Sequence, residues 1–179
     1  MKKGFAILII VIIACVFSYF MIVNHKNKNE SHVNQVSKVT HEKLDDVEKQ
    51  HGYKLYRPEQ TVKVKGAKLD LTSNEHSNES AVIKDMHDMT HQKVQAEFKE
   101  GAIEMTPAHV NTVYRIVNKS TFTHREELLA ILSKWKQKEF NEIVEDHNFL
   151  WKIQGGKIGK ATDRLTTREE KEFIENNFR

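Results

Sequence analysis

The chain has 179 residues, of which 39% are hydrophobic and 30% are charged, and its formal net charge is +3. Its distal part, residues 80–179, has sixteen basic and sixteen acidic residues, so it lacks the basic surface that nucleic-acid binding requires. Cys15 is the single cysteine, which excludes a disulfide bond within the chain and a cysteine nucleophile in the distal part.

An unbroken apolar run of twenty residues, 4–23, follows Lys2 and Lys3. In a helix that rises about 1.5 Å per residue, such a run spans the hydrocarbon core of a bilayer, which is about 30 Å thick. We therefore predict a single-pass transmembrane signal-anchor at residues 4–23 and a cytoplasmic tail at residues 1–3. The remainder of the chain is predicted to be extracytoplasmic, with the lipid bilayer as a partner of the apolar run.

Two alternatives to an uncleaved span remain open. A cleaved secretory signal has a shorter apolar core and a site of small residues, which this run lacks. The residues that end at Cys15 resemble a lipobox, in which the cysteine is acylated, but residues 16–23 stay apolar where a lipoprotein normally becomes polar. Cys15 is therefore an alternative lipidation site, and otherwise a small apolar residue within the helix.

Residues 24–79 are polar and rich in Asn, Ser, His and Lys, with too few apolar residues to form a core, and are predicted to be a stalk. Residues 62–71 alternate with period two around Gly66, which indicates a small hairpin. A helix-like spacing of four apolar residues indicates one short helix, at Val36, Val39, Leu44 and Val47.

Residues 80–179 have the pattern of about five amphipathic helices, which predicts a small all-α domain. The first helix is expected within residues 80–100 and ends at Gly101. The second begins with Thr106 as its N-cap and Pro107 in its first turn.

Two capping boxes and a glycine pair bound the other three helices. Thr123 with Glu126 opens the third helix, residues 155–156 end the fourth, and Thr166 with Glu169 opens the fifth. The apolar stripes of all five helices form the predicted core, which includes both tryptophans: Val82, Ile83, Met86, Met89, Val94, Val110, Val113, Val117, Leu128, Leu129, Ile131, Leu132, Trp135, Phe140, Ile143, Val144, Trp151, Phe173, Ile174 and Phe178.

His87 and His91 are four residues apart, a spacing that lets two imidazoles on one helical face reach one metal ion. The zinc-peptidase motif has a glutamate directly after its first histidine, whereas this chain has Asp88, which is one methylene shorter. No third ligand follows at a recognisable spacing, although the fold could bring one close from His109, His124 or His147.

The favoured interpretation is that His87 and His91 border the core, half-buried and bonded to a neighbouring backbone or carboxylate group, with no metal or other cofactor. The alternatives are a structural metal site and a metal-dependent hydrolase that uses both histidines with Asp88 or Glu97.

Residues 155–162, with the sequence GGKIGKAT, look like a phosphate loop but depart from its pattern. Three residues instead of four separate Gly155 from Gly159, and Ala161 replaces the hydroxyl residue. We predict a left-handed helix cap and a tight turn. The alternative is a backbone nest that holds a small anion with Gly155, Gly156, Lys157 and Lys160.

Four motifs carry a resemblance: Met89-Thr-His-Gln-Lys-Val94, Gly101-x-Ile-Glu-Met-Thr106, His147-Asn148 and Trp151-x-x-Gln-Gly-Gly-x-x-Gly-Lys-Ala-Thr162. They resemble uncharacterised single-span membrane proteins of Bacillus and related Gram-positive bacteria, grouped as a domain of unknown function. The resemblance covers residues 80–179, and Glu100 stands where such proteins often have a tryptophan. It implies a membrane address and a distal domain, and no activity.

Together these features predict a membrane-tethered, non-enzymatic helical module that binds another protein or a component of the cell envelope. The alternative function is a metal-dependent hydrolase that uses His87 and His91.

Overall fold

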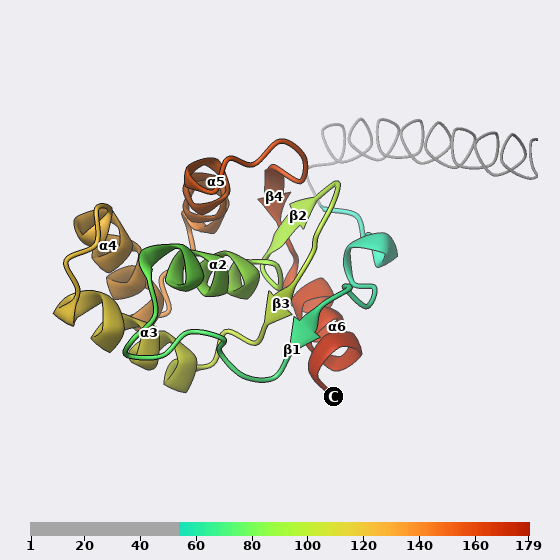
Figure 1. Cartoon of the computed structure of the whole chain (residues 1–179). Helices are drawn as coiled ribbons and strands as arrows, with labels where there is room; N and C mark the ends of the chain where they lie inside the picture. The colour runs from blue at the N-terminus through green and yellow to red at the C-terminus, as the bar shows by residue number, and fades with distance from the viewer. Residues whose placement is uncertain (1–53) are drawn as a thin grey trace, which may run out of the picture. The chain divides into compact units, whose positions relative to one another are not determined.

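The computed structural model describes residues 54–179. Their elements follow in the order η1 (Pro58–Gln60), β1 (Ala67–Lys68), α2 (Glu79–Thr90), β2 (Val94–Ala96), β3 (Ala102–Ile103), α3 (Pro107–Lys119), α4 (Arg125–Lys136), α5 (Ile143–Ile153), β4 (Ala161–Arg164) and α6 (Thr167–Phe178) (Figure 1). The predicted transmembrane run, Cys15 and the short helix at residues 36–47 lie outside the described residues. Within residues 54–179, no helix is long and apolar enough to cross a membrane.

The described residues are mostly helical, with the predicted number of five α-helices, but they also contain four short strands, which form two small sheets. β1 pairs in parallel with β3, and β2 pairs antiparallel with β4. Val94, which was predicted on the first helix, lies in β2: that helix ends at Thr90, whose carbonyl accepts a turn hydrogen bond from the Lys93 N–H. All three residues of β2 are buried against β4 and the core.

The hairpin predicted at residues 62–71 is also wrong. Ala67 and Lys68 pair with Ala102 and Ile103, so this segment adds to a distant strand and does not fold back on itself. At the start of this pairing the Gly101 N–H donates to the Lys65 carbonyl at 2.9 Å, and Gly66, with a φ of +83°, makes the turn that follows.

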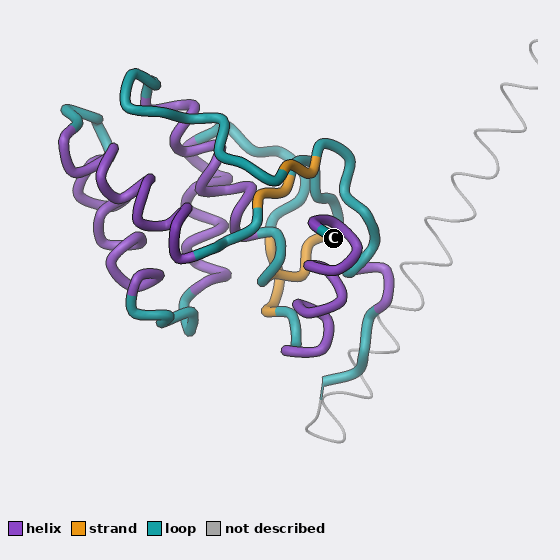
Figure 2. The backbone as a smooth tube through the Cα atoms, turned by 90° about the horizontal axis from the view of Figure 1, so that it is seen from below, coloured by secondary structure: helices purple, strands orange, loops and turns teal. Residues whose placement is uncertain are grey.

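Two clusters of buried side chains form the core. The larger cluster joins α2, α3, α4 and α5, which lie together on one side of the strands in Figure 2. The smaller cluster lies between α6 and the β1–β3 sheet, and contains Val64, Ala102, Leu165, Phe173 and Phe178. Most of the predicted core residues are buried, including Trp135, which is 2% exposed.

Trp151 was expected in the core, and this prediction is wrong. Its side chain is half-buried at the surface of α5, where the indole Nε1–H donates to the Ile158 carbonyl at 2.7 Å. Gly156 lies directly against the ring, because a Cβ atom there would be only 2.3 Å from the indole nitrogen. The tryptophan therefore packs on the glycine-rich loop that follows its own helix.

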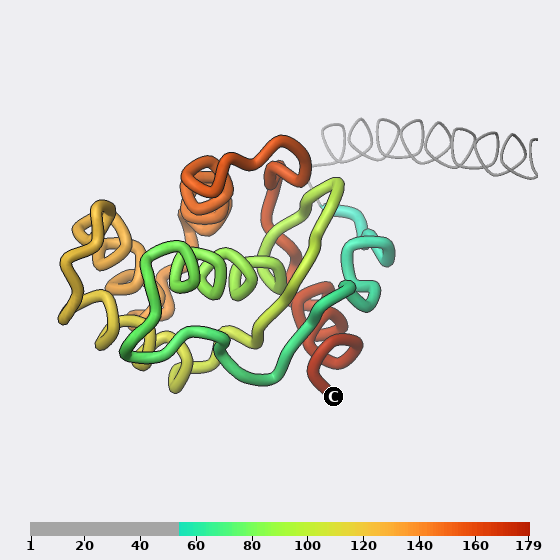
Figure 3. Tube along the Cα trace, viewed as in Figure 1, coloured from blue at the N-terminus to red at the C-terminus, as the bar shows by residue number. Residues whose placement is uncertain are grey.

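Two buried polar side chains of α6 hold the segment that enters the domain, whose path is seen in Figure 3. Glu169 accepts a hydrogen bond from the Arg57 backbone N–H at 2.6 Å, and Asn177 accepts one from the Val64 N–H at 2.7 Å. The compact unit begins at Tyr56, so residues 56–79, assigned to the stalk from sequence, pack as part of the domain.

The predicted caps are confirmed at two helices. Thr106 accepts from the His109 N–H at the start of α3, and Thr166 forms the expected reciprocal box with Glu169 at the start of α6. The box predicted at the start of α4 is wrong. The helix begins after His124, and Glu79 of α2 accepts from the backbone N–H groups of Thr123 and His124 at 3.1 and 2.7 Å.

Of the two residues that could cap the start of α4, Glu79 and Thr123, only Glu79 should therefore matter for stability. We expect Glu79→Ala to lower the free energy of unfolding by about 1–2 kcal/mol, because it leaves two N–H groups of a helix start without an acceptor. Thr123→Ala, at an exposed side chain, should change it by less than about 0.5 kcal/mol. Denaturant unfolding of both variants measures the two changes. A larger loss of stability in Thr123→Ala than in Glu79→Ala would contradict the role of Glu79 and support the capping box predicted from sequence.

Candidate metal centre

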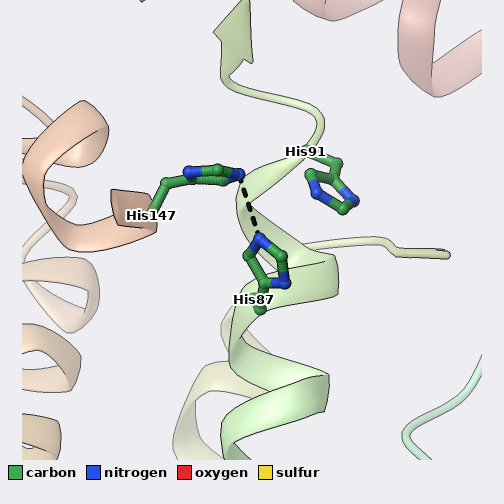
Figure 4. A group of neighbouring side chains, drawn as sticks. All are labelled: His87, His91 and His147. Carbon is green, nitrogen blue, oxygen red and sulfur yellow. Dashed lines mark hydrogen bonds between the residues drawn. The ribbon is translucent and has the colours of Figure 1, made fainter. Parts of the chain in front are cut away.

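Three histidine side chains converge where α2 packs on α5 (Figure 4). His87 lies in the last turn of α2, His91 is the C-cap residue of that helix, and His147 comes from the middle of α5. Each offers one ring nitrogen, and these three nitrogens lie within 4.8 Å of one another. The Nε2 atoms of His87 and His147 are 3.0 Å apart.

Neighbouring oxygens orient two of the three rings. His91 Nδ1 lies 2.6 Å from the Gly101 carbonyl oxygen, and His147 Nδ1 lies 3.1 Å from Asn148 Oδ1. The Asn148 amide is itself held by the backbone of Ala161, from which it accepts and to which it donates. With Nδ1–H donated to an oxygen, each of these rings keeps the lone pair of Nε2 for another partner, as metal-binding histidines do.

Gly101 is needed for this arrangement. Its φ of +79° is in the left-handed region, and a Cβ atom there would lie 2.6 Å from a carboxylate oxygen of Asp88. Only glycine therefore lets the chain bring its carbonyl to His91 at this point.

All three imidazoles are held in the neutral form. Burial, with His147 and Lys84 as additional causes, lowers the pKa of His87 to about 3. Burial lowers the pKa of His147 to about 4 and that of His91 well below its usual value. Neutral imidazole is the form that binds a metal, so no proton has to be removed from a charged ring at pH 7.

A pocket of about 220 Å³ opens beside the histidines. His87 and His91 line it, whereas His147 is fully buried. Its other walls come from α2, the β2–β3 connection, α5 and the glycine-rich loop: Lys84, Phe98, Glu100, Trp151, Gln154, Gly156, Ile158 and Gly159. The cluster is therefore reached from solvent on the side of His87 and His91.

The other candidate residues are placed elsewhere. Asp88 is buried and accepts from Lys84 at 2.8 Å, and burial raises its pKa to about 6 although Lys84 opposes this. Glu97 is exposed and does not line the pocket. His109 bonds the Glu104 carbonyl, and His124 bonds Glu79.

The glycine-rich loop forms a turn. Gly155 has a φ of +73° and its N–H donates to the Lys152 carbonyl at 3.0 Å, as predicted for a left-handed helix cap. The side chains of Lys157 and Lys160, the cations of the alternative anion site, are exposed. The loop thus serves to form one wall of the pocket.

His147 is the site residue that sequence reasoning did not single out. The pattern of α5 contains a signal, because Ile143 and Leu150 are fully buried and His147 lies between them at helical spacing. The burial of its neighbours therefore marks His147 as the candidate third ligand for the pair His87 and His91.

Residues 86–175, which contain all three histidines, match a family described as a family of unknown function, DUF6241. Neither a curated protein nor a solved structure matches the chain. The match covers half of the sequence, and the chain belongs to the DUF6241 family.

Proposed function

We propose that this chain is a membrane-tethered metal-binding protein whose extracytoplasmic domain holds a zinc ion on His87, His91 and His147. The convergence of three ring nitrogens within 4.8 Å carries the proposal. The apolar run at residues 4–23 supports the tether, because its length suits a bilayer core.

The donor set favours zinc or a neighbouring first-row metal over calcium and magnesium. Imidazole nitrogen suits zinc and its first-row neighbours, whereas calcium and magnesium prefer oxygen. Nitrogens bound about 2.0–2.1 Å from one tetrahedral zinc ion lie about 3.4 Å apart. The 3.0 Å between His87 and His147, and the limit of 4.8 Å for all three nitrogens, bracket that spacing, so small ring rotations would complete the site.

The sequence-based interpretation of His87 as a histidine that borders the core agrees with its half-burial, but its hydrogen-bond partner is another imidazole. Without a metal, the Nε2–H of His87 donates to the Nε2 lone pair of His147, since the His147 proton is on Nδ1. A metal ion would use both Nε2 atoms once the His87 proton moves to Nδ1, the other neutral tautomer of that ring.

The hydrolase alternative has little support from the candidate bases, and a protein or an envelope component is kept as a proposed further partner. In the hydrolase alternative Asp88 or Glu97 acts as the base, yet Asp88 is paired with Lys84, and Glu97 lies outside the pocket lining. Glu100 is the carboxylate that lines the pocket.

The metal content of the untagged full chain, purified in detergent, tests the proposal. We expect one equivalent of zinc by elemental analysis after dialysis against a weak chelator, because three ligands hold one ion. His87→Ala, His91→Ala and His147→Ala should each reduce it to well under one equivalent.

His109→Ala and His124→Ala are matched controls, since both histidines bond elsewhere, and they should retain the metal. Equal zinc in the wild type and in the triple variant of His87, His91 and His147 would refute the site.

A further inference from the structure

The three histidines leave one side of the cluster open. His147 is fully buried, while His87 and His91 line the pocket. Zinc usually has four ligands, and sites with three protein ligands keep a fourth position for water or another molecule. The fourth position would face the pocket, which is where the cluster is reached from solvent.

The charge of the site favours an anion in this position. The oxygens that orient His91 and His147 belong to a backbone carbonyl and a side-chain amide, so both are neutral. Two carboxylates lie near the histidines, and each has a cation of its own. Asp88 is paired with Lys84 at 2.8 Å. Glu100, which lines the pocket and is 59% exposed, lies 3.8 Å from Lys65. The two positive charges of the ion are thus not matched by a carboxylate that is free of another cation, and an uncompensated buried charge is costly.

Part of the pocket wall beyond the histidines is apolar. Phe98, Trp151 and Ile158 belong to it, and Phe98 and Ile158 are 47% and 66% exposed, so their side chains are open to a ligand. The wall is also held in place: the indole of Trp151 donates to the Ile158 carbonyl at 2.7 Å. Gly159 packs against Phe98, since a Cβ atom there would lie 2.5 Å from the Phe98 carbonyl oxygen.

The volume limits the size of the ligand. A pocket of about 220 Å³ is smaller than the roughly 300–1,000 Å³ that is typical of sites for drug-sized ligands. This suits a small organic molecule.

We propose that the metal centre binds a small carboxylate with an apolar substituent, whose carboxylate takes the fourth metal position and whose substituent lies on Phe98, Trp151 and Ile158. This inference rests on the proposed metal site. It names the ligand class that the pocket selects.

Cobalt substitution tests the inference in the full chain in detergent, because the visible spectrum of bound Co²⁺ reports changes in its ligands. Phenylacetate and acetate serve as probes with the same carboxylate. Both should change the spectrum until the site is saturated. Phenylacetate should bind at least about tenfold more tightly than acetate, because its apolar ring moves out of water onto the apolar wall of the pocket.

Ile158→Ser should reduce the preference for phenylacetate over acetate severalfold. Ile158 is mostly exposed, so this change spares the core. Trp151→Leu is a second variant with the same expectation. Leu69→Ser is the matched control, because Leu69 is 63% exposed and lies outside the pocket lining, and it should keep the wild-type preference.

The outcomes separate the two proposals. Absence of bound Co²⁺ and Zn²⁺ would refute the metal site. Bound Co²⁺ whose spectrum responds to neither probe would overturn the open position and leave the metal site standing. An equal affinity for both probes, unchanged in Ile158→Ser and Trp151→Leu, would overturn the role of the apolar wall.

Discussion

Saturating Zn²⁺ should raise the unfolding temperature of the metal-free protein by about 10 °C. A ligand that binds only the folded state at about a hundredfold above its dissociation constant adds about 2.7 kcal/mol. For a domain of this size, each kcal/mol corresponds to about 4 °C. Differential scanning calorimetry of the full chain, with and without Zn²⁺, measures the change.

Variants assign this stabilisation to particular rings. His91→Ala and His147→Ala should each abolish most of the increase, since either leaves only two nitrogen ligands. His109→Ala should keep it, because that ring bonds the Glu104 carbonyl at the start of α3. If Zn²⁺ raised the unfolding temperature of His147→Ala as much as that of the wild type, Zn²⁺ would bind elsewhere on the chain.

Glu169→Ala should lower the free energy of unfolding by about 3–4 kcal/mol. The side chain is fully buried and accepts hydrogen bonds from Arg57 N–H, Thr166 N–H and the Thr166 hydroxyl at 2.6, 2.7 and 2.8 Å. Its loss leaves buried donors without an acceptor, each at a cost of about 1–3 kcal/mol, and removes the capping box of α6. Denaturant unfolding of the full chain measures the change.

Glu175→Ala is the control on the same helix, because Glu175 is exposed, and it should change stability by about 0.5 kcal/mol or less. Glu169→Gln keeps the shape of the side chain with one acceptor oxygen fewer, and should cost less than Glu169→Ala. A loss below about 1 kcal/mol in Glu169→Ala would show that water replaces the carboxylate.

The sequence predicted those helix starts whose cap lies within the helix itself. Thr106 and Thr166 bond backbone groups three residues later, so the local pattern contains both partners. The start of α4 could not be predicted in this way, because Glu79 reaches it from 44 residues earlier in the chain. Local spacing cannot distinguish such a distant acceptor from a capping box.

Strand β2 was missed for a similar reason. Val94 continues the helical spacing of α2, and only its pairing with Arg164 makes the strand recognisable. Two or three residues carry too little periodicity to indicate a strand, so tertiary pairing decided their conformation. For β1 the period-two pattern of residues 62–71 did indicate extended chain, but it could not indicate the partner, which is the distant β3.

At the candidate metal centre, the sequence predicted that His87 and His91 share a face and gave no means to choose the third ligand. His147 comes 60 residues after His87, and its approach depends on how α2 packs on α5. The pocket was likewise not predicted, because its walls combine α2, the segment around Phe98 and the loop around Ile158.

The contacts of the entering segment with α6 have a mechanical consequence. Tension applied through the N-terminal part of the chain would first load the bonds of Glu169 and Asn177 to Arg57 and Val64. The last helix of the domain would therefore bear the strain. The histidines lie on α2 and α5, whose side chains belong to the larger core cluster, and a pull of this kind could detach the entering segment before it disturbed them.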